Sequence, residues 1–120
     1  MINDYELGKI GEQKACDYLI EKGYELIDKN FRSRMGEIDL VVKKGQILVF
    51  VEVKLKTSDK FGTPEEMITP AKIGKVRKMA EFFLLKHPEF REMLYRIDTV
   101  CLLANESGEI ANLNHYEDLQ

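Results

Sequence analysis

Hydrophobic residues at the start of the chain recur with the spacing of an amphipathic helix. Along roughly the first 22 residues the apolar positions fall on one approximate stripe. Asn3 or Asp4 can cap the start of such a helix, and Gly23 favours its end. Gly8 and Gly11 each cost about 1 kcal/mol relative to alanine, so we expect the helix to approach the sheet, or a phosphate, closely here. The stripe consists of Leu7, Ile10, Ala15, Tyr18 and Leu19.

The apolar segments that follow have the pattern of strands and of one more helix. Residues 24–32 form a first candidate strand, and residues 36–54 contain two apolar runs joined by a glycine-containing turn, which is typical of a β-hairpin. A second helical stripe covers residues 70–86, and two further strands are predicted at 95–103 and 109–116. The helix between the third and fourth strands predicts that these strands pair in parallel. We therefore expect an α/β fold with a mixed central sheet flanked by helices on both faces.

Three charged residues interrupt the apolar runs of the predicted hairpin. Asp39 lies in its first strand, and Glu52 and Lys54 share one face of its second strand because side chains alternate. Two carboxylates close together repel and raise each other's pKa unless a cation lies between them. Hard oxygen ligands with room for water and phosphate suit Mg²⁺ or Mn²⁺. The pattern therefore favours a divalent metal site.

A simpler interpretation exists for charged residues in strands. An isolated Glu-x-Lys is more often an ion pair on a solvent-facing strand. Here the apolar run 49–51 and Val53 are typical of a strand covered on both faces, which argues against that interpretation. Asp98 also interrupts an apolar strand, and pairing with Arg96 or with a main-chain donor explains it better than metal binding.

Basic residues near the strand ends and along the second helix are candidate phosphate contacts. Arginine matches phosphate oxygens in a bidentate way, whereas lysine supplies a point charge. A solvated turn explains the two arginines equally well when only the sequence is considered. A basic stripe on a helix is more often a solvated face, although here the helix directly follows the charged residues, which favours binding. Phe82 lies among the helix lysines, and for it we favour a subunit contact over a stacking surface. The candidates are Arg32, Arg34, Lys56, Lys60, Lys72 and Lys75.

Composition narrows the class of protein. A chain of 120 residues with 44% hydrophobic and 32% charged residues fits one globular domain, residues 1–120. The net charge of −3 counts against a general nucleic-acid binder but permits a local basic patch. We find no apolar stretch of membrane-spanning length and no signal-peptide pattern, and Cys16 and Cys101 have the surroundings of core residues in a reducing compartment. We therefore expect a cytoplasmic protein with no membrane partner.

A series of short motifs is spread along the chain. They are Gly8-x-x-Gly11-Glu12, Asn30-Phe31-Arg32, Arg34-x-Gly36-Glu37-Ile38-Asp39-Leu40, Val49-Phe50-Val51-Glu52-Val53-Lys54, Phe61-Gly62-x-Pro64 and Lys72. In these motifs the chain resembles the YraN-like family of uncharacterised bacterial proteins, over essentially its whole length. The resemblance implies a restriction-endonuclease-like (PD-(D/E)XK nuclease) fold with an αβββαβ core, similar to that of archaeal Holliday-junction resolvases.

The same resemblance implies roles for individual residues. Asp39 and Glu52 would hold the metal, helped by the main-chain carbonyl of Val53. Lys54 would orient or deprotonate the attacking water and stabilise the negative charge that develops on the phosphate. Glu12 would complete the acidic cluster, directly or through water.

Lys72 would contact DNA near the scissile phosphate. Two positions depart from the pattern. Ile38 stands where the nuclease motif is named for a proline, which is a common departure of little consequence. Lys56 stands where the family usually has an arginine, and lysine cannot make the bidentate phosphate contact. The second departure bears on tight substrate binding rather than on the chemistry.

We therefore predict an endonuclease that hydrolyses DNA phosphodiester bonds with Mg²⁺ or Mn²⁺, with branched or structured DNA as a candidate substrate. The alternative is a non-catalytic nucleic-acid-binding or adaptor protein that keeps the fold, although such a protein has no reason to keep Asp39, Glu52 and Lys54. A third hypothesis is a structural protein that assembles through Phe82 and the second helix. We also expect a homodimer, because enzymes that cut duplexes often act in pairs.

Overall fold

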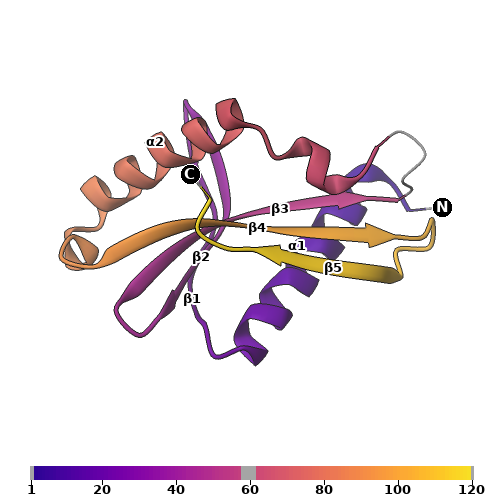
Figure 1. Ribbon diagram of the computed structural model, residues 1–120, viewed down its shortest axis with the longest axis horizontal. Coiled ribbons are helices and arrows are strands. Elements are labelled where there is room, and N and C mark those ends of the chain that lie inside the picture. The colour runs from indigo at the N-terminus through magenta and orange to yellow at the C-terminus, as the bar shows by residue number, and fades with distance from the viewer. Residues whose placement is uncertain (1, 58–61, 120) are drawn as a thin grey trace.

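The chain folds into a five-stranded mixed sheet with one long helix on each face (Figure 1). The computed structural model describes residues 2–57 and 62–119, so Lys60 and Phe61 lie outside the described residues. The strands follow one another in the sheet in chain order. The elements are α1 (Asp4–Glu21), β1 (Glu25–Ser33), β2 (Gly36–Lys44), β3 (Ile47–Lys56), the 3₁₀ helix η1 (Pro64–Met67), α2 (Pro70–Lys86), the 3₁₀ helix η2 (Pro88–Phe90), β4 (Leu94–Ala104) and β5 (Ile110–Tyr116).

The predicted order of elements and the predicted fold class are confirmed. The Asn3 side chain caps α1 by accepting a hydrogen bond from the Glu6 N–H at 2.8 Å. Strands β3 and β4 pair in parallel, with α2 as the crossover between them. The other three neighbouring pairs are antiparallel. A mixed sheet with this order of helices and strands is consistent with an αβββαβ restriction-endonuclease-like core.

The sheet separates two hydrophobic cores, and β3 contributes to both. Val49 and Val51 pack on the side of α1, where Leu19 is fully buried. Leu48 and Phe50 pack on the side of α2, where Phe83 is fully buried. The prediction that this strand is covered on both faces is confirmed for residues 48–51, which have no exposed surface, whereas Val53 is only partly buried.

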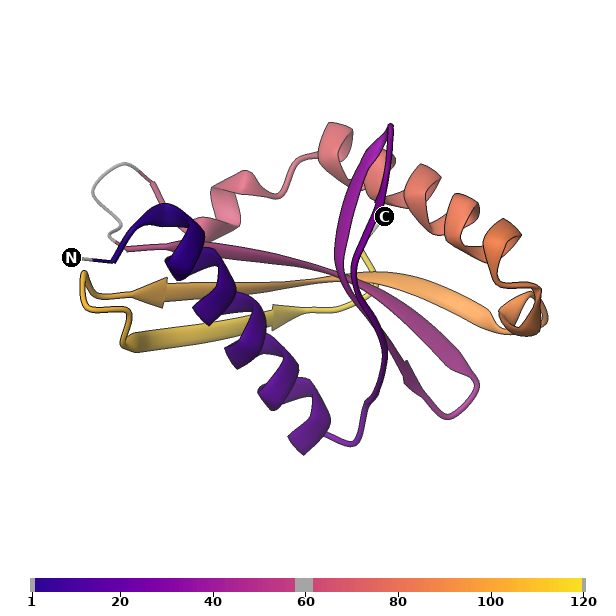
Figure 2. The same ribbon diagram turned by 180° about the vertical axis from the view of Figure 1, so that it is seen from behind.

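Strands β2 and β3 part before either of them ends. Their last pair is Leu40 with Val51. Beyond it, β2 stays paired with β1 as far as Gly36, while β3 stays paired with β4 as far as Lys56. The β1–β2 hairpin crosses the rest of the sheet steeply, and its turn lies beside α2 (Figure 2). The divergence begins at Asp39, so the predicted site lies where two strands separate.

The two glycines of α1 have different surroundings. A Cβ on Gly11 would lie 3.0 Å from Leu55 Cδ1, so the close approach of the helix to the sheet, expected from the sequence, occurs at this residue. Gly8 has no comparable contact among the described residues, and it borders a cavity that also includes Glu12 and Lys54. Packing against the sheet therefore explains Gly11 but not Gly8.

Asp98 is fully buried in β4, yet it remains ionised because four donor atoms from three residues bind it. It accepts hydrogen bonds from Arg96 Nε at 3.0 Å, His115 Nε2 at 2.7 Å and the Asp118 N–H at 3.0 Å, and Arg96 Nη2 is 3.2 Å away. Burial raises the pKa of this carboxyl, but the hydrogen bonds from His115 and Arg96 outweigh burial and hold the pKa below its usual value. The expected pairing with Arg96 is confirmed, and His115 is an additional partner.

Two expectations from composition can be compared with the structure. Cys16 and Cys101 are free, buried core residues, and burial raises the pKa of the Cys101 thiol to about 12. Within residues 2–57 and 62–119, no helix has the length and apolar character needed to cross a bilayer.

The packing of α2 can be tested with two variants of the same helix. Phe83 is fully buried against Phe31 and Phe50, with ring centroids 5.0 and 5.5 Å away. Replacing it (Phe83→Ala) should lower the free energy of unfolding by about 3–5 kcal/mol. Leu85 is 82% exposed, so Leu85→Ala should change the free energy of unfolding by less than about 0.5 kcal/mol. Urea unfolding followed by circular dichroism measures both values, and equal losses would contradict the described packing.

Candidate functional site

Three carboxylates from two elements meet where β2 leaves β3. Glu12 projects from α1, and Glu37 and Asp39 project from β2. One carboxylate oxygen from each lies within 4.8 Å of the other two. We refer to Glu12, Glu37 and Asp39 as the carboxylate cluster. Its members come from distant parts of the sequence, so the fold itself creates this concentration of negative charge.

Asp39 is held by a main-chain donor of the neighbouring strand. Its Oδ2 accepts a hydrogen bond from the Val53 N–H at 2.7 Å. The β2–β3 ladder has already ended at Val51, so the carboxylate supplies the acceptor that the departing strand no longer provides. In an extended strand the N–H and C=O of one residue point to the same edge. The carbonyl of Val53 is therefore directed toward the edge at which Asp39 lies.

Glu52 and Lys54 lie beside the carboxylate cluster on the side of α2. Their charged groups form an ion pair, with Glu52 Oε2 3.3 Å from Lys54 Nζ. Both line a cleft of about 210 Å³, together with Lys72 and Lys75 of α2. Glu52 is not a member of the carboxylate cluster, although its negative charge acts on Asp39.

Burial and neighbouring negative charge both disfavour the ionised form of Asp39. Burial, and then the charge of Glu52, raise the pKa of Asp39 from 3.8 to about 7, and the hydrogen bond from Val53 only partly opposes them. The other two carboxylates of the cluster raise it further. Burial also raises the pKa of Glu52, although Lys54 opposes this. The arrangement is costly without a counter-charge, and an all-oxygen donor set of this kind fits a hard divalent cation.

Asn30 connects two members of the carboxylate cluster. Its Nδ2 donates to Glu12 Oε1 at 3.1 Å and to Glu37 Oε1 at 2.8 Å. The residue has a φ of +52°, a left-handed conformation that asparagine tolerates better than most residues. Lys9 Nζ lies 3.5 Å from Glu12 Oε1 and 3.3 Å from Asn30 Oδ1. The amide therefore sets the position of two carboxylates relative to each other.

The sequence analysis assigned no role to Asn30 or Glu37. A signal for Glu37 was present, because residues two apart on a strand share a face and Glu37 precedes Asp39 by two. The signal for Asn30 was weak, since the left-handed backbone that directs its side chain depends on the tertiary fold.

The predicted basic residues are distributed over three places. Lys72 and Lys75 line the cleft of Glu52 and Lys54. Lys56 lines the cavity of about 430 Å³ on the other side of Lys54, which also includes Glu12. Arg32 is engaged by Glu37, whose Oε2 lies 3.0 Å from Arg32 Nε. Arg34 lies at the β1–β2 turn and borders a different cavity.

Lys54 is the residue that joins the two sides of the site. It lines both the cleft toward α2 and the cavity toward α1. A ligand that occupied either space would meet the same ammonium group. The arrangement therefore combines a cluster of carboxylates, the ammonium group of Lys54 beside it and lysines on both sides that could meet an anionic ligand.

The metal-free protein should lose stability as the pH rises from about 4 to about 7. The folded state keeps Asp39 protonated in this window while the unfolded chain ionises it, so the free energy of unfolding falls as pH rises and levels off above the folded pKa. The full shift corresponds to roughly 4 kcal/mol at most. The Asp39→Asn variant cannot ionise, yet its amide oxygen can still accept the Val53 N–H. Urea unfolding in EDTA across this range should therefore give a flatter profile for the variant, and identical slopes would contradict the raised pKa.

Comparison with known proteins identifies the family. The model of "Uncharacterised protein family UPF0102" matches residues 11–102. A UPF0102 protein of Caldicellulosiruptor saccharolyticus is 40% identical over 113 residues, covering 94% of this chain and 95% of that protein. One of Syntrophomonas wolfei subsp. wolfei is 44% identical over 110 residues, covering 92% and 93% of the two chains. One of Thermodesulfovibrio yellowstonii is 48% identical over 109 residues, covering 89% and 94%. The YraN-like resemblance is thus confirmed, and the chain belongs to the uncharacterised protein family UPF0102.

Proposed function

We propose that this protein is a Mg²⁺- or Mn²⁺-dependent endonuclease that hydrolyses phosphodiester bonds in DNA. The observation that carries the proposal is the convergence of carboxylates from α1 and β2 where the sheet opens, with Glu52 of β3 near enough for its charge to act on Asp39 and with Lys54 paired to Glu52. A protein with only a structural role gains nothing from placing Asp39 among other acids, where its ionisation is disfavoured.

Asp39, Glu52 and the main-chain carbonyl of Val53 would hold the metal ion. The fit is chemical, since these donors are oxygens and their combined charge requires a cation. The hydrogen bond from the Val53 N–H already fixes one oxygen of Asp39, which leaves its other oxygen for the ion. The ion, when bound, would polarise the phosphate and make a bound water more acidic.

The remaining groups of the site would position water and substrate. Lys54, held beside Glu52, would orient or deprotonate the attacking water and stabilise negative charge that develops on the phosphate. Glu12, held by Asn30, would act on the ion directly or through water. Glu37 accepts a hydrogen bond from Asn30 through one oxygen and pairs with Arg32 through the other, so we assign it a role in positioning these two side chains.

DNA suits the lysines that surround the acidic centre. Lys72 and Lys75 line the cleft from the side of α2 and would contact the phosphates next to the scissile bond, and the charge of Lys72 acts on Glu52. Lys56 would hold the backbone on the opposite side of Lys54. One chain supplies one such site, so cutting both strands of a duplex in one encounter would take a homodimer.

Removing one site carboxylate should abolish metal-dependent cleavage. Asp39→Asn and Glu52→Gln should each lower the cleavage rate by at least about 100-fold, because a preorganised charged group is lost from the site. Glu25 is an exposed carboxylate of β1, and Glu25→Gln changes the same chemical group without touching the site. Cleavage of labelled branched, single-stranded and duplex DNA with Mg²⁺ or Mn²⁺ measures the rates. Full activity in Asp39→Asn would overturn the proposal, and salt-sensitive binding without cleavage in the wild type would favour a non-catalytic adaptor.

Metal binding can be tested without any DNA. Mn²⁺ at 100 times its dissociation constant should stabilise the wild-type protein by about 2.7 kcal/mol, measured as an increase in the free energy of unfolding. Asp39→Asn and Glu52→Gln should lose most of this stabilisation, whereas Glu37→Gln should keep more of it. Loss in Glu37→Gln with retention in Glu52→Gln would instead assign the ion to the carboxylate cluster. No stabilisation of the wild type by either ion would contradict the metal site.

A further inference from the structure

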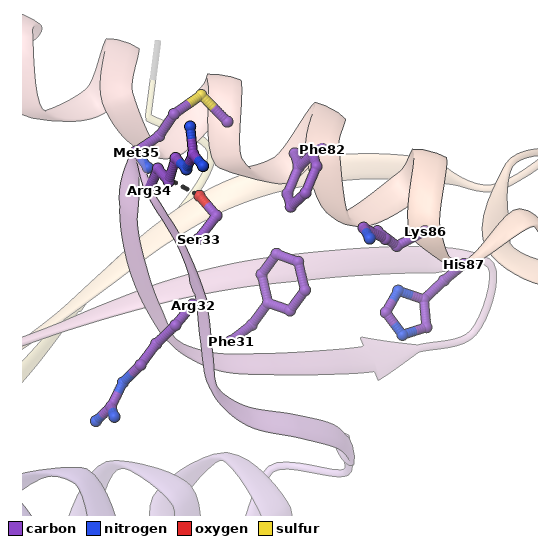
Figure 3. Close-up of a pocket in the computed structure, with 8 residues that line it drawn as sticks. All are labelled: Phe31, Arg32, Ser33, Arg34, Met35, Phe82, Lys86 and His87. Atoms are coloured by element: carbon purple, nitrogen blue, oxygen red, sulfur yellow. Dashed lines mark hydrogen bonds between the residues drawn. The ribbon is translucent and has the colours of Figure 1, made fainter.

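A second cavity lies next to the proposed site, between the β1–β2 hairpin and the end of α2 (Figure 3). Its volume is about 640 Å³, larger than either cavity beside Lys54. Ligand pockets typically enclose about 300–1,000 Å³, so this space is large enough for one nucleobase and its sugar. The proposed chemistry uses none of the apolar residues that line it.

Aromatic rings form much of the wall of this cavity. Phe31 of β1 faces Phe82 of α2, with the two ring centroids 5.9 Å apart (Figure 3). It also faces His87, the residue that follows α2, at 6.1 Å between ring centroids. His87 is stacked on the buried Phe83 at 3.9 Å, which fixes the imidazole in place. Phe82, in contrast, is only half-buried. The helix therefore presents one phenyl ring to the cavity while its neighbour Phe83 belongs to the core.

Two cations line the same cavity. Arg34 is exposed at the β1–β2 turn, and Lys86 Nζ lies 5.4 Å from the centroid of the Phe82 ring. Among the described residues, neither cation has a carboxylate oxygen within 4.0 Å. Arg32 also borders the cavity, but its guanidinium points away from the rings and pairs with Glu37 (Figure 3). The cavity thus combines an aromatic wall with two cations that are available to an anionic ligand.

The cavity shares one lining residue with the cleft of the proposed site. Met35, which is 48% exposed, lines both spaces. On one side of Met35 lie Arg34 and Lys86, and on the other lie Lys72 and Lys75. A strand of nucleic acid that crosses Met35 would therefore meet cations on both sides, with the acidic centre at one end and the aromatic wall at the other.

We propose that this cavity binds an unpaired base of single-stranded DNA by stacking on Phe82, while Arg34 and Lys86 contact the adjoining phosphates. The inference rests on the proposed function, because it takes DNA as the ligand of the neighbouring cleft. Stacking on a side chain needs an exposed base face, and aromatic platforms beside cationic grooves bind single strands without sequence preference. In a fully paired duplex the faces are covered by neighbouring bases. The substrate class would then be DNA with a single-stranded segment, as found at branches, flaps and ends.

This inference changes the interpretation of Phe82. From the sequence we favoured a subunit contact, because an apolar residue among lysines often marks an interface. A second copy of the chain would bring its own positive α2 face against Arg34 and Lys86, and like charges would oppose that contact. The negative backbone of DNA complements the same two cations. Charge complementarity therefore favours the nucleic acid as the occupant.

The test measures binding in EDTA, where no metal-dependent cleavage can occur. The probes are a short fluorescein-labelled oligothymidine and a blunt-ended, fully paired DNA duplex with the same label, titrated by fluorescence anisotropy. Phe82→Leu keeps an apolar side chain but removes the ring, and we expect it to bind the single strand about 10-fold more weakly. The Leu85→Ala variant changes an exposed apolar residue of the same helix and should bind like the wild type. Both variants should bind the blunt-ended duplex as the wild type does.

The Arg34→Gln variant tests the same inference in case Phe82→Leu does not fold. Arg34 is exposed, so Arg34→Gln should fold normally and should also weaken binding of the oligothymidine, with a smaller dependence on salt than the wild type. Unchanged single-strand affinity in folded Phe82→Leu, or in Arg34→Gln if the first variant unfolds, would overturn the inference. So would a wild-type protein that binds only the blunt-ended duplex, or one that binds no DNA and dimerises through Phe82.

The two proposals can fail separately. If metal-dependent cleavage is found and Phe82→Leu binds the single strand normally, the cavity inference is wrong and the nuclease proposal stands. If the wild type binds the single strand through Phe82 but cleaves nothing with Mg²⁺ or Mn²⁺, the nuclease proposal is wrong and the stacking site stands.

Discussion

The hydrogen bond from the Val53 N–H to Asp39 is the interaction on which the site depends. A buried main-chain donor needs an acceptor, and β3 loses its β2 partner after Val51. The carboxylate of Asp39 supplies that acceptor at 2.7 Å. The sheet can therefore open without leaving the donor unpaired, but only by bringing an ionisable group into a buried place. The same contact thus gives the Val53 N–H its acceptor and places the Asp39 carboxylate where its ionisation is disfavoured.

The surroundings of Asp39 become clear when it is compared with Asp98. Both are carboxylates in apolar strands. Asp98 is fully buried, but Arg96, His115 and a main-chain N–H bind it and its pKa is lowered. Asp39 has one main-chain donor and several negative neighbours, and its pKa is raised to about 7. A carboxylate that is neutralised by donors within the fold has a structural role, whereas a carboxylate with a raised pKa and few positive neighbours is typical of a functional site.

Rigid supports surround the acidic centre. Glu12 comes from a helix that packs closely on β3 at Gly11, and Asn30 links Glu12 to Glu37 across two elements. Lysines on α2 and at the end of β3 lie around this negative centre. The net charge of −3 therefore does not describe the local electrostatic potential that an anionic ligand would encounter at this site. What matters is that negative charge is concentrated at one point and positive charge borders it.

The sequence determined the order of elements, the parallel pairing of β3 with β4 and the burial of β3. The elements and the burial of β3 follow from local periodicity, which can be read from short stretches of sequence. The parallel pairing follows from the helix that connects the two strands. It also singled out Asp39, Glu52 and Lys54, because charges within apolar runs are conspicuous along the chain.

Only the tertiary structure decided which acids meet. The approach of Glu12 to Glu37 and Asp39 depends on how α1 crosses the sheet and on where β2 leaves β3, and neither is encoded by the spacing of residues in one element. The left-handed backbone of Asn30 and the cavity between Phe31 and Phe82 arise in the same way, from segments far apart in sequence. Local patterns are set by neighbours along the chain, whereas the position of one side chain relative to another across the fold is set by packing, and packing is a property of the whole molecule.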